Sequence, residues 1–374
     1  MSKKVVSALP ARVIDQAQQF FGLLRDPLCC ILAGLTLASC TTLPSQPASP
    51  PPAQPPARTP AATTRNPALA MLASHVARQE RLYRIAAPLL VKNALLCRTN
   101  SRALLGFTAK NRMSYSADMV DAAKDLLSLD DRLQVMSVLE GGGAMRAGIK
   151  AGDVLLSVQD VTLPQGKNAE TEAARLLAGV VSGASRLSVR VLRDGQPLTI
   201  DVPTTMACAF AIELGHVDYV NAYSDGRRIL LTRGMLDFLT TDTAIAVLIA
   251  REMAHNILQH PQALQMSGTV AAVIDQLQSF KPDLSALAGS SGIKTLAPKM
   301  DEEADRLALY LLARAGYDPG TAITTLQGLA AVNPQSVANG YTALHPLSPQ
   351  RVALMTQTVA EIRQKQIAKK AVLP

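Results

Sequence analysis

One predicted helix carries side chains at a spacing that is used for metal chemistry. It contains Arg251-Glu252-Met253-Ala254-His255. In the H-E-x-x-H pattern, two histidines at i and i+4 bind a metal ion from one helical face, and the glutamate deprotonates the metal-bound water. Because a guanidinium keeps its proton in a protein, Arg251 offers donors and a fixed positive charge where the metal needs a lone pair. The chain therefore keeps the glutamate and one histidine of the pattern and lacks the other histidine.

The elements around this helix predict a mainly helical domain with a small sheet. An Asp225-Gly226 turn joins two short strands, and Thr241 or Asp242 can cap the helix that we expect to run to His260. Periodic apolar residues predict further helices. These helices cover about 69–97, 117–128, 301–315 and the segment from Pro349 onward.

Between residues 132 and 204 the pattern changes to short β-rich runs. A helical pattern at 169–181 interrupts the runs, and an Asp194-Gly195 turn joins the last two as a hairpin. The expected strands are 133–139, 154–158, 187–192 and 198–202, and a further strand is expected at 103–108.

The β-rich part resembles the PDZ domain family. The segment that runs from Gly141-Gly142-Gly143 through Ala147-Gly148-Ile149 to Gly152-Asp153-Val154 parallels the family's SPA-x-x-AGL-x-x-GD-x-I pattern. The resemblance implies a small β-sandwich that captures an extended polypeptide on a sheet edge. Leu105, Gly106 and Phe107 resemble the loop that holds the peptide's C-terminal carboxylate, although an apolar run with one glycine is also an ordinary strand end.

The region 207–355 resembles the gluzincin metallopeptidase family that includes the CAAX prenyl protease and the bacterial membrane protease HtpX. The resemblance rests on several segments in order along the chain. They are Asn221 to Gly226, Arg251 to His255 with His260, Asp301-Glu302-Glu303-Ala304-Asp305, Leu311 to Pro319, and His345-Pro346 with Arg351.

The metallopeptidase resemblance implies roles for individual residues and leaves two interpretations open. It places the general base at Glu252, one zinc ligand at His255, and a further ligand, normally glutamate, at Asp301. In the first interpretation no metal binds, and the Arg251 guanidinium replaces the zinc cation by pairing with Asp301 or Glu252. In the second, His255, Asp301 and His345 hold zinc, and Glu252 activates water.

The amino terminus resembles a bacterial lipoprotein signal peptide. Basic residues precede an apolar run at 28–38, and Leu37-Ala38-Ser39-Cys40 closes the segment. The apolar run is too short to span a membrane. A short anchor or a buried helix is the alternative. The resemblance implies that Cys40 is lipidated, and Thr41 after it favours the outer membrane of a Gram-negative bacterium. We therefore expect a periplasm-facing protein that is attached to the membrane through lipid.

Composition supports a folded protein and gives no sign of nucleic-acid binding. Of the 374 residues 48% are hydrophobic, and the net charge of +8 is scattered and forms no basic block. After Cys40 is lipidated, the mature chain keeps Cys97 and Cys208. In an oxidising compartment these suggest a disulfide that joins the entry and exit of the inserted domain, and two separate buried thiols are the alternative.

These observations predict an α+β protein with a PDZ domain inserted into a metallopeptidase-like domain. The expected ranges are 1–39 for the signal peptide, 40–67 for a proline-rich tether, 68–131 and 205–374 for the metallopeptidase-like domain, and 132–204 for the PDZ domain. The preferred function is the binding of polypeptide substrates or envelope partners by a degenerate peptidase in protein quality control, without a cofactor. The alternatives are an active zinc endopeptidase and an envelope scaffold.

Overall fold

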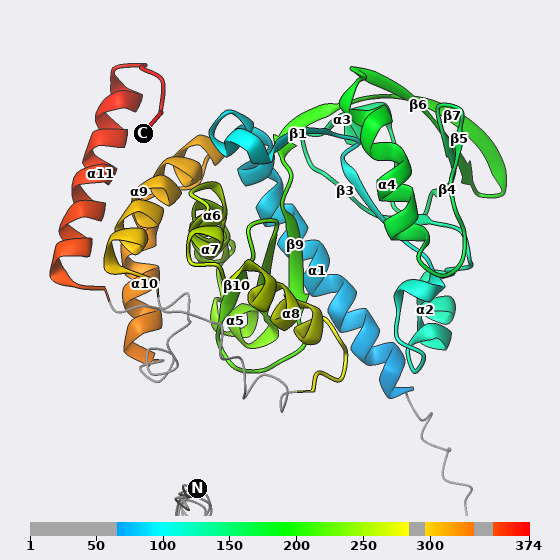
Figure 1. The fold of residues 1–374 in the computed structure, drawn as a ribbon, viewed down its shortest axis with the longest axis horizontal. Helices are drawn as coiled ribbons and strands as arrows, with labels where there is room; N and C mark the ends of the chain where they lie inside the picture. Colours follow the sequence, from blue (N-terminus) through cyan, green and yellow to red (C-terminus); the bar gives the residue numbers. More distant parts are fainter. Residues whose placement is uncertain (1–65, 284–295, 333–346) are drawn as a thin grey trace, which may run out of the picture. The chain divides into compact units, whose positions relative to one another are not determined.

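The computed structural model describes residues 66–283, 296–332 and 347–374, and Figure 1 draws their fold. These residues form an α+β fold, which confirms the predicted fold class. The helices are α1 (Pro67–Lys92), η1 (Ala94–Asn100), η2 (Arg112–Ser114), α2 (Val120–Leu127), α3 (Gly143–Ala147), α4 (Ala169–Ser182), α5 (Arg233–Phe238), α6 (Asp242–Ile257), α7 (His260–Ala263), α8 (Ser267–Leu277), α9 (Pro298–Ala315), α10 (Thr321–Val332) and α11 (Pro349–Ile367). The strands are β1 (Ser101–Leu104), β2 (Phe107–Lys110), β3 (Gln134–Val138), β4 (Val154–Val158), β5 (Val161–Thr162), β6 (Arg186–Arg193), β7 (Gln196–Pro203), β8 (Thr205–Cys208), β9 (Ala211–Gly215), β10 (Ala222–Ser224) and β11 (Arg228–Thr232).

Helix α6 lies at the centre of the largest hydrophobic core. It begins where the Thr241 side chain accepts a hydrogen bond from the backbone N–H of Ala244, so one of the two predicted caps is used. Helices α1, α9 and α10 pack against α6. Every residue of α6 from Ile245 to Ile257 is buried, and the polar side chains on this helix therefore face the protein interior.

Two predicted helix boundaries differ from the structure. Helix α6 ends at Ile257, and a separate helix, α7, begins at His260. Gln259 between them is left-handed, with φ 60°. Pro261 explains the break, because proline lacks the N–H that would donate to the Ile257 carbonyl and continue α6. Helix α1 likewise ends at Lys92, before the predicted limit at residue 97.

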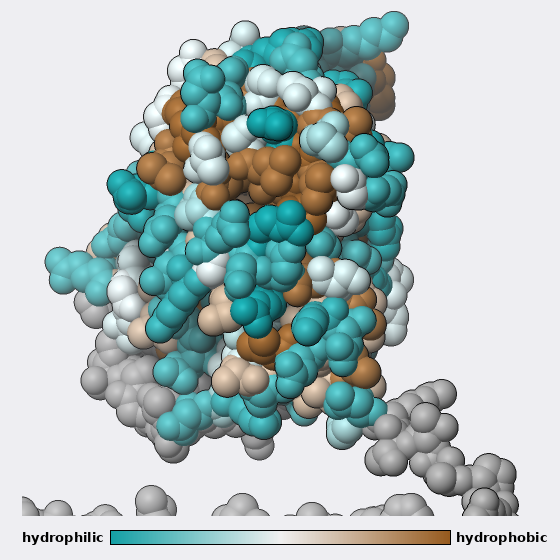
Figure 2. Space-filling model, turned by 90° about the vertical axis from the view of Figure 1, so that its right-hand side faces the viewer, coloured by the Kyte–Doolittle hydropathy of each residue, from teal (hydrophilic) through white to brown (hydrophobic). Residues whose placement is uncertain are grey.

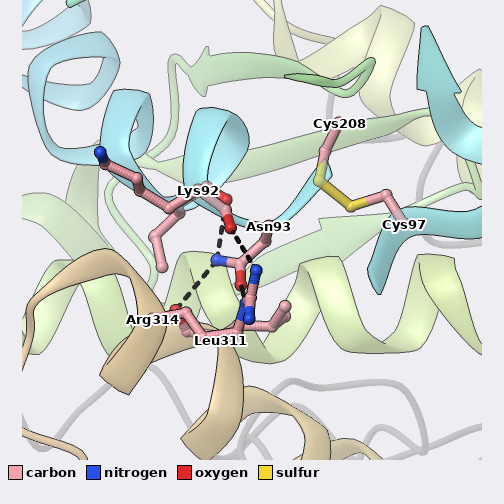
Figure 3. The surroundings of a disulfide bond; sticks show 7 residues. Lys92, Asn93, Cys97, Cys208, Leu311 and Arg314 are labelled. Atoms are coloured by element: carbon pink, nitrogen blue, oxygen red, sulfur yellow. Dashed lines mark hydrogen bonds between the residues drawn. A yellow bond between two sulfur atoms is a disulfide. The ribbon is translucent and has the colours of Figure 1, made fainter. Parts of the chain in front are cut away.

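The C-terminal end of α1 is joined to α9 by a buried asparagine (Figure 3). The Asn93 amide nitrogen donates to the carbonyl oxygens of Leu89 and Leu311, at 2.9 and 3.0 Å. Arg314 donates to the Asn93 side-chain oxygen at 3.1 Å and to the Lys92 carbonyl at 2.9 Å. Because every polar atom of this buried amide is paired, the contact fixes α1 to α9 without a desolvation penalty.

A disulfide lies next to this contact and joins Cys97 in η1 to Cys208 at the end of β8 (Figure 3). Their Cα atoms are 5.5 Å apart, and both residues are fully buried. Strands β1 and β8 form an antiparallel pair directly beyond it, from Ser101 opposite Cys208 to Leu104 opposite Thr205. The disulfide and this strand pair hold together the two chain segments that lead into and out of the β-rich part.

The β-rich part is built on a six-stranded sheet. Its strand order is β2-β3-β4-β6-β7, and β5 pairs with β4. The sheet begins at Phe107 in β2, before the predicted limit at residue 132. The predicted strand at 103–108 is in fact divided between two sheets, because Gly106 adopts φ +86° and turns the chain between β1 and β2.

A second, three-stranded sheet contacts the C-terminal half of α6. Its order is β10-β11-β9, with β10 antiparallel and β9 parallel to β11. The predicted hairpin around Asp225 and Gly226 is β10 and β11, and Gly226 has φ +98° as the tight turn requires. Within the described ranges, no helix has both the length and the apolar character needed to cross a membrane.

Candidate functional site

The altered motif lies in the protein interior. Arg251, Glu252 and His255 project from α6 and are only 1%, 3% and 2% exposed. Asp301 in the first turn of α9 is 2% exposed. The packing of α6 against α9 brings these residues together. His345, the other predicted ligand, lies outside the described residues.

Arg251 is surrounded by three carboxylates. Its Nη2 donates to Oδ1 of Asp301, and its Nε donates to Oδ1 of Asp305 at 3.1 Å. Its Nη1 lies 3.7 Å from Oε1 of Glu252. Burial by itself lowers the pKa of Arg251, but the negative charges of Asp301, Asp305 and Glu252 outweigh burial and raise that pKa above its ordinary value. The guanidinium is therefore a permanent cation at the centre of an acidic cluster.

A second arginine completes this cluster from the C-terminal helix. Arg351 on α11 donates through Nε and Nη2 to Oδ2 of Asp305, at 2.9 and 2.6 Å. Asp305 thus bridges two buried arginines and connects α6, α9 and α11. The sequence prediction did not include this bridge. The available signal was the spacing of Asp301 and Asp305, which places both carboxylates on one face of α9.

Glu252 is held in place by strand β10. Ser224 at the end of β10 donates from Oγ to Oε2 of Glu252 at 2.6 Å. One turn later, Asn256 accepts from the Gly226 N–H at 2.6 Å and donates to the Arg228 carbonyl at 3.1 Å. These contacts fix the register between the β10–β11 hairpin and α6. Ser224 and Asn256 were not identified from the sequence as site residues.

His255 and His260 form a buried pair. Their Nδ1 atoms are 2.9 Å apart, so one ring donates and the other accepts. On the far side of the pair, Nε2 of His255 lies 3.9 Å from Oδ1 of Asp301, and Nε2 of His260 lies 3.5 Å from Oε2 of Glu303. Burial lowers the pKa of His260, and the nearby Glu303 opposes this lowering only in part.

The described residues of this cluster do not fit a zinc ion. A zinc site in a protein needs at least three ligands that converge on one point. Within 66–283, 296–332 and 347–374, no three His, Cys, Asp or Glu side chains are arranged to hold a metal. Asp301, the ligand predicted beside His255, instead accepts a hydrogen bond from Arg251. A cation bound at this carboxylate would have to displace the guanidinium.

A second candidate site is a groove on the β-rich part. Strand β2 ends the six-stranded sheet, so one of its edges has no strand partner among the described residues. A hollow of about 750 Å³ lies between β2 and α4. Phe107 and Ala109 line it from β2, Leu177 and Val181 line it from α4, and Leu105 lines it from the preceding loop. Of the three residues predicted to bind peptide, Leu105 and Phe107 line this groove, and Gly106 lies between them.

The face that carries the β-rich part also exposes apolar side chains. Figure 2 views the molecule from this side and shows apolar residues gathered on its upper part. Exposed apolar residues in the elements of this part include Met145, Leu176, Leu198 and Met206. Of these four residues, Met206 also lines the groove, so the apolar surface continues into it there.

Comparisons with known proteins agree with the division of the chain into two kinds of structure. Residues 201–359 match the profile of peptidase family M48, and residues 105–204 match the PDZ domain profile. The second match begins close to β2, in agreement with the start of the sheet. Solved structures that match include the HtrA3 PDZ domain bound to a phage-derived ligand, at 18% identity over 28% of this chain and 88% of that chain, with a TM-score of 0.21. Another is the HtrA-type protease AlgW with decapeptide, at 22% identity over 28% and 30%, with a TM-score of 0.22.

Two curated relatives also match. The chain is 28% identical over 142 residues to the mitochondrial metalloendopeptidase OMA1 of Arabidopsis thaliana, which covers 37% of this chain and 29% of the relative. It is 24% identical over 147 residues to the protein of the same name from Schizosaccharomyces pombe (strain 972 / ATCC 24843), covering 37% and 43%. The chain thus spans less than half the length of either relative. Residues 201–359 are similar to peptidase family M48, and residues 105–204 are similar to a PDZ domain.

Proposed function

We propose that this protein binds polypeptides through its PDZ-like groove and that its M48-like part is a degenerate peptidase without bound zinc. The position of the Arg251 guanidinium supports the second part of this proposal, that the M48-like part holds no zinc. It is paired with Asp301 and Asp305 and lies near Glu252. Without it, Arg351 would be the one arginine among the described residues that is paired within this group of buried carboxylates. A cluster that already contains the fixed charges of two arginines has less affinity for a further cation.

The groove supports the first part of the proposal, that the protein binds polypeptides. An extended peptide that pairs with the edge of β2 would satisfy backbone groups that have no strand partner among the described residues, and the apolar lining would take alternate side chains. The backbone turns at Gly106, between Leu105 and Phe107, which both line the groove, and we propose that this turn holds the terminal carboxylate. We therefore propose polypeptides with an apolar C-terminus as ligands.

We further propose that the protein is lipidated at Cys40 and faces the periplasm from the outer membrane of a Gram-negative bacterium. The basis for this is the Leu37-Ala38-Ser39-Cys40 sequence. In that location, a peptide-binding protein with an M48-like part would act in protein quality control by holding unfolded or misassembled polypeptides.

The groove is tested by a matched pair of neighbouring leucines. Leu177 lines the groove, whereas Leu176 on the same helix does not and is 40% exposed. We expect Leu177→Glu to weaken the binding of a fluorescein-labelled decapeptide ending in valine at least tenfold, and Leu176→Glu to leave it within twofold. Fluorescence anisotropy measures both. Equal affinity of both variants and the wild type would contradict binding in this groove.

A second candidate function is zinc endopeptidase activity. It is favoured by the retention of Glu252 and His255 and by the hydrogen bond that orients Glu252 towards Ser224. An active enzyme would cleave unfolded casein, lose this activity on treatment with a chelator, and lose it again on Glu252→Gln substitution. We expect no such cleavage. Chelator-sensitive cleavage that requires Glu252 would replace our first proposal with this one.

A further inference from the structure

A second hollow, of about 400 Å³, lies on the opposite side of β2 from the groove. Thr108 and Lys110 of β2 line it, whereas Phe107 and Ala109 line the groove, because successive side chains of a strand point to opposite faces. The remaining walls come from α1, β3, β9, η2 with the residues after it, and the end of α8 with the segment after it. Figure 1 shows α1 running beside β9. We call this hollow the imidazole pocket, after His75 on α1 and His216 after β9.

The walls of the imidazole pocket contain polar atoms that have no hydrogen-bond partner among the described residues. These atoms are Nδ1 of His75, Oγ1 of Thr108 and Nε2 of His216. His216 is only 8% exposed. Buried polar atoms in proteins are almost always paired with protein, water or a ligand, because leaving one unpaired is energetically costly. The volume lies within the range of about 300–1,000 Å³ found for small-molecule sites. The pocket is therefore suited to a polar occupant.

The charge of the pocket favours a cation. Glu213 on β9 and Glu80 on α1 both line the pocket, and neither forms an ion pair within the described part of the chain. Lys110, the cation among the lining residues, lies 3.9 Å from Glu170 on α4. The pocket therefore has more acidic groups than cations to balance them. Burial raises the pKa of the Glu213 carboxyl, and Lys110 and a hydrogen bond with the Gln278 side chain only partly oppose this, so a cation bound beside Glu213 would stabilise its charged form.

The pocket also contains a cluster of three aromatic rings. The rings of His75 and His216 stack with centroids 4.7 Å apart, and the ring of Phe280 lies 5.1 and 4.1 Å from them. Burial lowers the pKa of His75 to about 3 and that of His216 to about 4. Both imidazoles are therefore neutral near pH 7, and each has one nitrogen that accepts a hydrogen bond.

We propose that the imidazole pocket binds an organic cation with a planar head of N–H donors, of the guanidinium or amidinium class. Such a head matches the oxygens of the Glu213 carboxylate in a forked pair. Its remaining N–H groups can donate to a neutral imidazole nitrogen and to Thr108 Oγ1, and its flat face can stack on Phe280. This site is separate from both the groove and the Arg251 cluster, so it adds a binding activity to the proposed function.

Benzamidine tests this proposal, because it combines an amidinium with an aromatic ring. We expect isothermal titration calorimetry on the purified full-length protein to show saturable binding at one site. Benzamide, which is nearly the same shape but uncharged, should bind at least tenfold more weakly. Glu213→Gln should also weaken benzamidine binding at least tenfold, and Phe280→Ala should weaken it severalfold. Glu172→Gln on α4 removes the same charge away from the pocket and should leave binding unchanged.

Three results would overturn the proposal: no saturable binding of benzamidine, equal binding of benzamide, or full binding by a Glu213→Gln variant that unfolds at the wild-type temperature. Displacement of benzamidine by the groove decapeptide would also count against it, because the two sites are distinct. Agmatine and acetyl-Gly-Arg-Gly-amide then identify the source of the natural cation. Tighter binding of the peptide assigns it to an arginine side chain of a polypeptide, and tighter binding of agmatine assigns it to a free small molecule.

Discussion

Arg251 on α6 and Asp301 on α9 form a buried ion pair at the position where an intact H-E-x-x-H pattern would hold a metal ion. The two residues are 50 positions apart, and each is almost fully buried. The guanidinium is part of the chain and supplies positive charge to the buried carboxylates at the helix interface. A metal ion would have to be acquired from solution. Folding of this part of the protein should therefore depend on Arg251 and not on metal supply.

Replacement of Arg251 by alanine should strongly destabilise the protein. It leaves Asp301 and Asp305 buried with fewer cations, and the loss of one partner of a buried ion pair costs about 3–5 kcal/mol. Urea unfolding followed by circular dichroism measures this difference. The double variant Arg251→Ala/Asp301→Asn should recover part of the loss, because it also removes an uncompensated charge. An Arg251→Ala protein as stable as the wild type would contradict a structural role for the guanidinium.

The disulfide between Cys97 and Cys208 should contribute measurably to stability. It closes a loop across a sequence separation of 111 residues, and removal of such a link typically costs about 2–5 kcal/mol. We expect Cys97→Ala/Cys208→Ala to lower the free energy of unfolding by this amount. Reductant should lower the stability of the wild type and have no effect on the double variant. If reductant does not change the free energy of unfolding of the wild type, the disulfide does not contribute to stability.

Stability should fall as the pH decreases from about 6.5 to 4. The folded-state pKa values of His75 and His216 are lowered mainly by burial, to about 3 and about 4. Smaller effects come from the charge of His216, Lys110 and Arg78 on His75, and from Arg233 on His216. Between these values and about 6.5, the unfolded chain binds more protons than the folded one, so each histidine contributes a slope of at most about 1.4 kcal/mol per pH unit. Denaturation at several pH values measures the slope. His75→Gln/His216→Gln should make it shallower, and an unchanged slope would rule out these two groups as its source.

The sequence predicted the main elements well, because their periodicity and turns are local properties. The strand 154–158 agrees with β4, the helix 169–181 differs from α4 by one residue, and Gly316 ends α9 in the left-handed region as expected. The errors come from single residues that change the backbone path. Gly106 sends β1 and β2 to different sheets, and Pro261 separates α7 from α6. Neither effect follows from hydrophobic periodicity.

The candidate sites were predicted only in part, because the rest depends on tertiary packing. A resemblance to known motifs brought Arg251, Glu252, His255 and Asp301 together, and the structure places all four in one cluster. The pairing of Asp305 with Arg351 depends on how α11 packs against α9. His75 and His216 are far apart in the sequence and have no motif, so nothing in the sequence predicts that their rings stack.

The most direct test of the account is the zinc content of the protein, purified without a chelator or a histidine tag and measured by inductively coupled plasma mass spectrometry. Arg251→His/Asp301→Glu, which restores the predicted family ligands, should be measured beside it. We predict far less than one zinc per chain in the folded wild type and an increased content in the double variant. About one zinc per wild-type chain, lost on His255→Ala substitution, would contradict the replacement of the metal by Arg251.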